Sequence, residues 1–159
     1  MSERRAARPD IVVRVPSRTE FLALLRDVTR RMAEIGGFDP AQVEGLALAV
    51  EEASTRVIEH ANAGAGDRVV ELGYFDQVGA LRIDLVDHGA DADQTKTAGA
   101  DLVRAASGRH AGEAGRQLLG KGMDSVPLHR SRRRNARGNI CRMVKRKPPS
   151  GGGGTPGAR

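Results

Sequence analysis

The stretch LALAVEEASTRVIEHA, residues 46–61, is the part of the sequence from which the fold can be worked out. Asp39 and Pro40 stand shortly before it, and these residue types are typical of a helix N-cap and a first helical turn. Side chains suited to burial then recur every three or four residues, which predicts one helix that ends before the small-residue loop 62–67. The face that we expect to be buried consists of Val43, Leu46, Ala47, Val50, Ser54, Val57 and Ala61.

A polar stripe lies beside this apolar face. Glu52, Arg56 and His60 follow one another at intervals of four residues, which places them on one slanting line of the helix surface. The stripe could form the floor of a polar pocket. It could equally be an ion pair between Glu52 and Arg56 on a solvated surface, worth a few tenths of a kcal/mol. Spacing alone favours the ion pair.

The residues before this helix predict a strand and a first helix. Ile11, Val13 and Val15 alternate with other residues, as in a short strand that ends at Pro16. Residues 17–20, SRTE, have the pattern of a capping box, in which Ser17 and Glu20 satisfy each other's backbone N–H groups. The helix that follows should end at Gly36-Gly37. Its predicted buried face consists of Phe21, Leu25, Val28, Met32 and Ile35.

The residues after the long helix predict a hairpin, a long connection, a short helix and a second hairpin. Residues 70–74 and 81–85 alternate as strands around a turn at 76–79. Residues 89–115 have few large apolar side chains, as lids and binding loops do. A helix over 115–124 and a closing hairpin of 126–130 with 140–146 complete the order. The sequence therefore predicts an α/β fold, a two-layer sandwich of a mostly antiparallel sheet with helices on one face.

Composition limits the class of protein. The 159 residues suit one domain, and we expect a flexible arm at 1–10, a domain at 11–147 and a disordered Pro/Gly-rich tail at 148–159. No apolar run is long enough for a membrane span, and the polar N-terminus lacks a signal-peptide core, so we expect a cytoplasmic protein. The single Cys141 forms neither an internal disulfide nor a zinc site.

The net charge of +6 is concentrated in the C-terminal third, between Arg130 and Lys147. Such a cluster can bind nucleic acid or an acidic protein surface, or it can simply be a solvated basic face. Aromatic residues make up only 3% of the chain, so the stacking side chains of many single-strand binders are missing. Composition therefore favours the solvated face over nucleic acid.

Two further places could carry chemistry. Asp87 follows the apolar strand 81–86 and is followed by Gly89, so its carboxylate could reach a ligand that comes close to the backbone. Gly112 and Gly115 precede the short predicted helix, whose free N–H groups could face a phosphate. Each signal is weak alone, and the sequence contains neither a Walker A motif nor GxGxxG.

These signals occur in the order of one family's motifs. LALAVEEASTRVIEHA resembles the N-box of the anti-sigma-factor serine/threonine kinases, which belong to the GHKL (HATPase, Bergerat-fold) ATP-binding domains. Glu52 and His60-Ala61 match this box, and Arg56 stands where the family has Asn. VDHGADAD, residues 86–93, resembles the next box, with Asp91 in place of a Gly. GEAGRQLLGKGMDSV, residues 112–126, resembles the third box, and residues 138–146 resemble the closing strand.

The resemblance implies a Bergerat-type sandwich with ATP and Mg²⁺ as cofactors. Glu52 would be the general base that activates a Ser hydroxyl of a protein substrate, and Asp87 would accept a hydrogen bond from the adenine amino group. His60 would lie in the same nucleotide site. Gly89, Gly112 and Gly115 would let the backbone close around the nucleotide. The implied partners are a sigma factor and a STAS-type anti-anti-sigma protein, and the implied assembly is a homodimer.

Arg56 is the main departure from the family pattern. The Asn of the family ligates Mg²⁺ through an oxygen, whereas a guanidinium has no acceptor and repels the ion. Arg56 could contact a phosphate directly, or it could pair with Glu52 and silence the base. Three hypotheses follow: a partner-switching regulator with weakened ATP use, a nucleotide-independent pseudokinase that acts by protein contact, and a basic nucleic-acid-binding protein.

Overall fold

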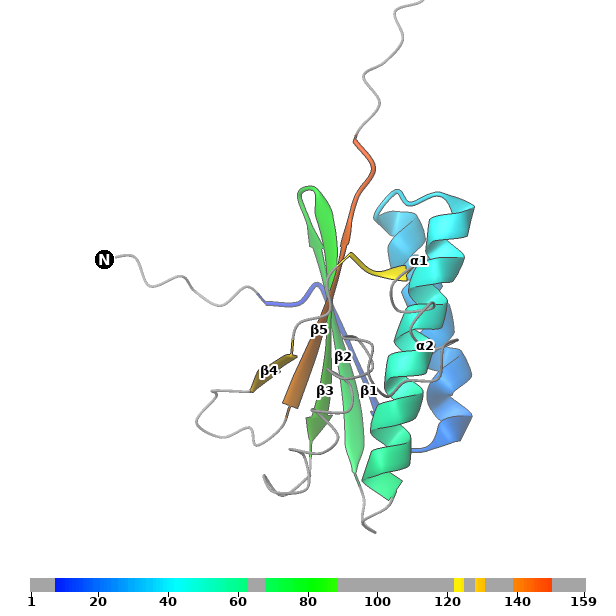
Figure 1. Ribbon diagram of the computed structural model, residues 1–159, viewed down its shortest axis with the longest axis vertical. Coiled ribbons are helices and arrows are strands. Elements are labelled where there is room, and N and C mark those ends of the chain that lie inside the picture. Colours follow the sequence, from blue (N-terminus) through cyan, green and yellow to red (C-terminus); the bar gives the residue numbers. More distant parts are fainter. Residues whose placement is uncertain (1–7, 63–67, 89–121, 125–127, 131–138, 150–159) are drawn as a thin grey trace, which may run out of the picture.

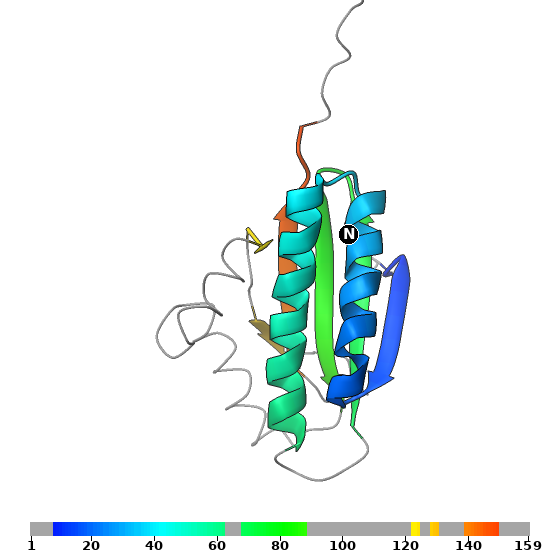
Figure 2. The ribbon, with the colours of Figure 1, turned by 90° about the vertical axis from the view of Figure 1, so that its right-hand side faces the viewer.

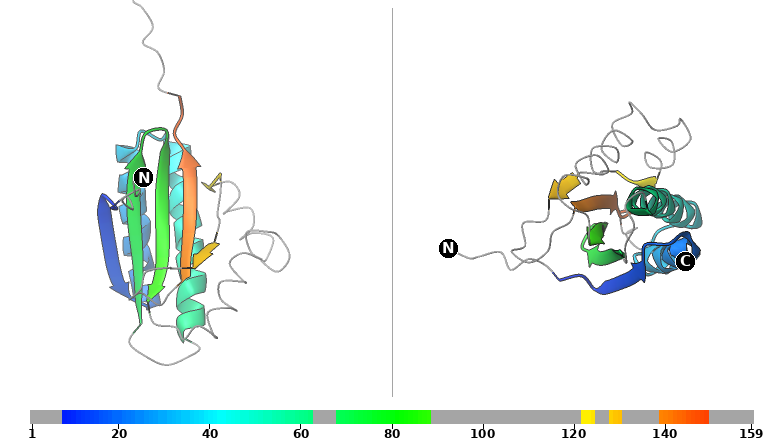
Figure 3. Two further views of the ribbon diagram at one scale, coloured as in Figure 1. Left: turned by 90° about the vertical axis from the view of Figure 1, so that its left-hand side faces the viewer. Right: turned by 90° about the horizontal axis from the view of Figure 1, so that it is seen from below.

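The computed structural model describes residues 8–62, 68–88, 122–124, 128–130 and 139–149 (Figure 1). In this part of the chain, the strands pair antiparallel in one sheet of order β1-β2-β3-β5-β4, and both helices cover the same face of it (Figures 1 and 3). The two-layer α/β sandwich is therefore confirmed. The elements are β1 (Ile11–Pro16), η1 (Thr19–Phe21), α1 (Leu22–Ile35), α2 (Pro40–Asn62), β2 (Val69–Gln77), β3 (Ala80–His88), β4 (Leu128–Arg130) and β5 (Asn139–Arg146).

The central hairpin forms as its sequence predicts. Gln77 pairs with Ala80, which leaves only Val78 and Gly79 in the turn between β2 and β3. Gly79 has a φ of 82°, a conformation that residues with a Cβ rarely adopt. The predicted connection 89–115, most of the helix 115–124 and Val126 lie outside the described residues.

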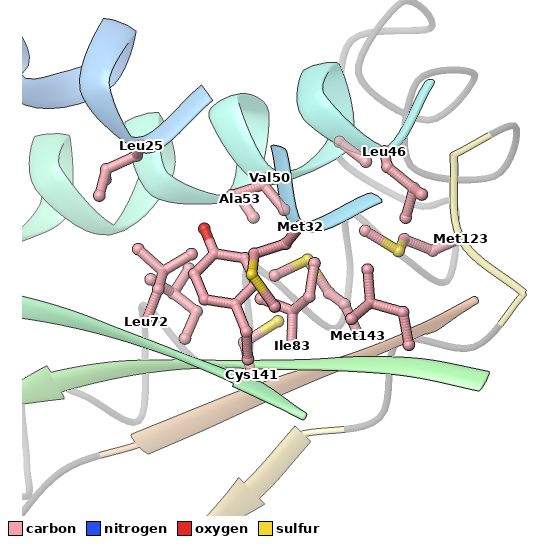
Figure 4. Packing of buried hydrophobic residues seen from close by; sticks show 14 of the residues in the cluster. Leu25, Met32, Leu46, Val50, Ala53, Leu72, Ile83, Met123, Cys141 and Met143 are labelled. Atoms are coloured by element: carbon pink, nitrogen blue, oxygen red, sulfur yellow. The ribbon is translucent and has the colours of Figure 1, made fainter. Parts of the chain in front are cut away.

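The core lies between the helices and the sheet. Buried side chains of α1 and α2 face those of β2, β3 and β5, and Figure 4 shows Met123 beside Leu46 and Met143. One buried polar contact joins the two layers, because the Thr29 hydroxyl lies 2.8 Å from the Tyr74 hydroxyl. Thr29 also donates to the Leu25 carbonyl, so both buried hydroxyls have partners.

The start of α2 confirms the predicted cap. The Gln42 backbone N–H donates to the Asp39 carboxylate at 2.9 Å, and the Asp39 N–H donates to the Gln42 side chain at 3.2 Å. These reciprocal bonds satisfy two groups that a helix N-terminus otherwise leaves unpaired. The buried face of α2 is wider than predicted, since Ala49, Ala53 and Ile58 are buried as well.

The predicted capping box at Ser17 is wrong. The Ser17 N–H donates to the Arg68 carbonyl at 2.8 Å, which extends the pairing of β1 with β2 by one residue. Ser17 thus stays with the sheet, and its buried hydroxyl has no partner in the described part of the chain. The helix instead begins with a 3₁₀ turn at Thr19, and Arg18 before it makes no side-chain cap.

The predicted buried face of α1 is wrong at its last residue. Ile35 is 60% exposed, while Thr29 and Ala33 are buried with Leu25 and Met32. The buried side of α1 continues from Met32 to Gly36, one helical turn later. Ile35 precedes Gly36 by one residue and therefore lies outside this buried side. Gly36 and Gly37 end the helix as expected, and Gly37 has a φ of 81°.

Residues 122–124 return to the described fold beside α2, on the side away from α1 (Figure 2). A Cβ on Gly122 would overlap the Gly45 carbonyl and lie 2.7 Å from the Ala49 Cβ, so only glycine allows this approach. Met123 is buried in the core. Asp124 donates its N–H to the Val144 carbonyl and accepts the Arg146 N–H at 2.7 Å.

We expect Gly122→Ala to destabilise the fold by about 1–3 kcal/mol, because the methyl group has no space between the two backbones. Urea unfolding of the full chain measures this loss. Gly73→Ala is the matched control, since the nearest atoms to a Cβ there lie at 3.4 Å, an ordinary contact distance. Equal stability of the two variants would show that residues 122–124 do not pack closely on α2.

Candidate functional site

The two flanks of α2 have different surroundings. Successive residues are turned by about 100° around a helix axis, so neighbours such as Glu51 and Glu52 point in different directions. Glu51 forms an ion pair with Arg26 of α1 at 3.1 Å, and Glu44 accepts two hydrogen bonds from Arg30 at 2.7 and 3.0 Å. The carboxylates on the α1 flank therefore hold the two helices together.

Glu52 and Arg56 form an ion pair on the other flank. The Arg56 Nε and Nη2 donate to the same oxygen, Oε1 of Glu52, at 2.9 and 2.7 Å. The side chains are 26% exposed for Glu52 and 23% for Arg56, so the pair is half-buried. In the described residues, the second carboxylate oxygen has no hydrogen bond. The ion pair predicted from the spacing is thus present, with one oxygen left for another donor.

The same flank receives the end of the connection 89–121. Gly45 and Ala49, which contact Gly122, precede Glu52 by two turns and by one turn along α2. The chain therefore re-enters the described fold one to two turns from the Glu52–Arg56 pair. The family resemblance puts two glycines of the nucleotide site, Gly112 and Gly115, in that connection.

For the remaining predicted site residues, the structure describes either the backbone alone or nothing. His60 lies in the last turns of α2, and Asp87 lies near the end of β3 opposite Val70. The C-terminal ends of α2 and β3 lie at the same end of the sandwich (Figure 1). The side chains of His60 and Asp87, and all of Gly89, Gly112 and Gly115, lie outside what the structure describes.

The side chains that surround Arg56 do not suit a metal ion. A guanidinium offers no lone pair, and the nearest carboxylate already accepts two hydrogen bonds from it. Glu51, the carboxylate next to Glu52 in the sequence, points to the other flank and pairs with Arg26. No group of three or more His, Cys, Asp or Glu residues within the described ranges could hold a metal ion.

A second charged cluster lies on the sheet face away from the helices, and our sequence analysis missed it. Arg142 donates from Nε and Nη2 to the two oxygens of Asp84 at 2.8 and 2.9 Å, and the Asp84 side chain is 10% exposed. Arg82 stacks over the Phe75 ring at 3.5 Å, and burial lowers the pKa of its guanidinium. Asp84 and Arg142 are opposite each other in the register of β3 with β5. Correct alignment of the two predicted strands would therefore have predicted this ion pair.

Three basic residues of the described segment 139–149 have carboxylate partners. Arg142 pairs with Asp84, Lys145 Nζ lies 3.2 Å from Asp124, and Lys147 Nζ lies 2.6 Å from Asp76. The nearby thiol is also inert, because burial raises the pKa of Cys141 to about 12. None of the helices in the described ranges is long and apolar enough to span a bilayer.

Comparisons with known proteins agree with this architecture. A family model described as the histidine kinase-like ATPase domain matches residues 15–145. A chain in the crystal structure of the SiaB–SiaC complex from Pseudomonas aeruginosa shares the fold, with a TM-score of 0.58 and 11% sequence identity. The similarity covers 87% of this chain and 91% of that chain. No curated protein matches this chain in sequence.

The geometry predicts a weak Glu52–Arg56 coupling, since half-exposed pairs four residues apart are worth about 0.3–0.5 kcal/mol. A double-mutant cycle with Glu52→Gln and Arg56→Gln, followed by urea unfolding, measures it. The Asp84–Arg142 pair serves as the comparison. It uses both carboxylate oxygens, and its carboxylate is 10% exposed against 26% for Glu52, so its coupling should be larger. An equal or larger coupling for Glu52–Arg56 would mean that this pair is more desolvated than the structure shows.

Proposed function

This chain belongs to the histidine kinase-like ATPase domain family, and we propose that it is a partner-switching regulator similar to the anti-sigma serine kinases, with weakened use of ATP. The observation that carries the proposal is the ion pair between Glu52 and Arg56 at the position of the family's metal ligand. Glu52 is the residue that the resemblance makes the general base. Arg56 donates two hydrogen bonds to one oxygen of this carboxylate and so fixes its position.

Weakened phosphotransfer follows from the chemistry of Arg56. Phosphoryl transfer depends on positive charge that is correctly placed around the phosphates. Arg56 supplies a positive charge but no ligand for a metal ion, and its hydrogen bonds point toward Glu52. A nucleotide phosphate would have to compete with this carboxylate for the guanidinium. We therefore infer low turnover and little dependence of nucleotide binding on Mg²⁺.

Protein contact is the second part of the proposal. The chain in the SiaB–SiaC complex, which has the same fold, stands in a complex between two different proteins. By resemblance, the partners proposed here are a STAS-type anti-anti-sigma protein, phosphorylated on Ser, and a sigma factor that is sequestered. A homodimer is the assembly that the resemblance implies.

A nucleotide-independent binding module is the second candidate, and the same ion pair favours it. Glu52 and Arg56 satisfy each other, so neither side chain needs a nucleotide to compensate its charge. Nucleic-acid binding is less well supported, because aromatic residues, which stack on the bases in many single-strand binders, make up only 3% of the chain. A salt titration with DNA tests this third possibility, since attraction by net charge alone disappears at moderate salt.

Asp87→Asn tests nucleotide binding. The substitution keeps the shape of the side chain but replaces an acceptor oxygen with an NH₂ donor. Loss of a charged hydrogen bond to adenine should weaken ATP binding by about 1.5–3 kcal/mol, measured by calorimetry. Asp27→Asn on the exposed side of α1 is the matched control and should bind ATP as the wild type does. Unchanged affinity in the Asp87 variant would remove the adenine contact from the proposal.

Arg56→Asn tests the account of weakened activity. The substitution supplies a metal ligand and frees Glu52, so ATP binding should become Mg²⁺-dependent and phosphate transfer to the cognate STAS-type protein should rise. Arg56→Met is the control, because it frees Glu52 without supplying a ligand. Calorimetry with and without Mg²⁺ and a phosphate-transfer assay distinguish these effects. Brisk transfer by the wild type, with no gain in the Asn variant, would contradict the assignment of Arg56.

A further inference from the structure

Exposed apolar side chains gather on one flank of the sandwich. Among the described residues, the exposed large hydrophobic side chains are Ile11, Val12, Leu24, Ile35 and Val78. All but Val78 belong to β1 or α1. These two elements lie next to each other at one edge of the molecule, with α2 on the other side of α1 (Figure 2). Exposed apolar side chains that cluster in this way mark a contact surface, whereas scattered ones need no explanation.

The apolar side chains of α1 form a stripe on this flank. Leu24, Val28 and Ile35 lie within about 40° of one another around the helix axis. Arg26 and Arg30, which pair with carboxylates of α2, point in nearly the opposite direction. The stripe therefore faces away from α2, toward the β1 side of the molecule. Leu24 is 47% exposed and Ile35 is 60% exposed.

β1 has a free edge in the described part of the sheet, where it is the first strand of the order β1-β2-β3-β5-β4. Residues of antiparallel strands alternate between pairs that exchange hydrogen bonds and pairs that do not. The Ser17 N–H bonds to the Arg68 carbonyl opposite it, so every second residue back along β1 bonds to β2 as well. The N–H and C=O groups of Val12 and Arg14 therefore point outward. Pro16 has no N–H and limits the length of this edge.

We propose that this flank is a homodimer interface, in which β1 of one chain pairs antiparallel with β1 of a second copy. The inference rests on the proposed function, because it names the surface through which the proposed homodimer forms. An edge strand with unpaired backbone groups is a template for another strand. A two-fold axis at Val13, perpendicular to the sheet, places Val12 of each copy opposite Arg14 of the other. Both outward-pointing residues of each strand then exchange N–H···O=C hydrogen bonds with the other copy.

Other registers of this pair fit less well. An axis at Arg14 would set the two Arg14 side chains directly opposite each other, and like charges in that position destabilise a sheet. An axis at Val12 would pair Arg14 with Asp10, which precedes the strand and whose N–H already bonds to β2. In the register around Val13, Arg14 keeps its ion pair with Glu71 of the same chain at 3.0 Å.

The same axis also brings the two α1 helices toward each other. Because the axis is perpendicular to the sheet, both helix layers lie on the same side of the joined sheet. The two apolar stripes then face each other and run antiparallel, with Leu24 of one copy directed toward Ile35 of the other. One symmetry operation therefore uses both the free backbone edge and the exposed side chains. An unrelated partner would have to match the two features separately, so a second copy is the favoured occupant.

Charge at position 12 tests the pairing, with the full chain alone in solution. Val12→Lys puts a cation opposite Arg14 of the other copy, so we expect the dissociation constant of the dimer to rise about tenfold. Val12→Glu puts an anion there and should lower this constant. Analytical ultracentrifugation measures both effects. Val78→Lys and Val78→Glu make the same changes at an exposed valine in the turn between β2 and β3, and should stay within about twofold of the wild type.

A cysteine at the axis tests the register. Val13 would lie opposite its own copy in a pair without hydrogen bonds, where the Cα atoms are about 4.5 Å apart, a distance that a disulfide spans. Val13→Cys should therefore cross-link the dimer under mild oxidation. Ile11→Cys is the matched control and should not cross-link, since its two copies would be about 13 Å apart along the strands. Ile11 is the more exposed of the two positions, and Cys141 is buried in both variants.

Three outcomes would overturn this interface. The first is a wild-type chain that stays monomeric at every concentration, and the second is equal weakening of the dimer by Val12→Lys and Val12→Glu. The third is equal cross-linking of the Ile11→Cys and Val13→Cys variants, which would show that the chains meet only by random collision. None of these measurements uses ATP or a STAS-type protein. The phosphate-transfer assay of Arg56→Asn therefore tests the proposed activity separately from the interface.

Discussion

Packing of α2 against the sheet and against α1 beside it is the constraint on which the rest of the structure depends. Its inner face must be apolar because it faces the sheet, and the ion pairs of Arg26 and Arg30 bring α1 against one of its flanks. Only the opposite flank is then left for chemistry. Glu52 and Arg56 lie on that flank, and Gly122 packs one to two turns before them.

By the family resemblance, Arg56 stands where a metal ligand is expected, and this matters because its side chain lies so close to that of Glu52. A neutral Asn in the same turn would leave the Glu52 carboxylate uncompensated, which favours a nearby cation. Arg56 provides that cation within the protein itself, with hydrogen bonds of 2.7 and 2.9 Å. The carboxylate is therefore compensated before any ligand arrives. Since the pair is only half-buried, the bond is weak enough to be broken by a competing phosphate.

Local patterns predicted most of the fold. Asp39 with Pro40, the Gly79 turn and the alternating strands are each determined by neighbours a few residues away, and all are confirmed. The failures involve distant partners. Ser17 continues the sheet because Arg68 is opposite it, and Thr29 is buried because Tyr74 supplies a hydroxyl. Single-sequence patterns cannot reveal these pairings.

The candidate site shows the same division. The i,i+4 spacing predicted the Glu52–Arg56 pair, whereas Asp84 and Arg142 are 58 residues apart and meet only through the strand register. The roles of His60, Asp87 and the three glycines come from resemblance alone and stay predictions.

The short segment 122–124 connects the flank of α2 that carries Glu52 to the C-terminal end of β5. Gly122 packs against Gly45 and Ala49, while Asp124 is bound to β5 on both its N–H and its carboxylate. Met123 between them is buried in the core. A ligand beside Glu52 can shift this segment only if the segment has a second arrangement that the ligand stabilises. Such an arrangement would have to expose Met123 and break the bonds of Asp124, so the geometry favours a segment that stays fixed.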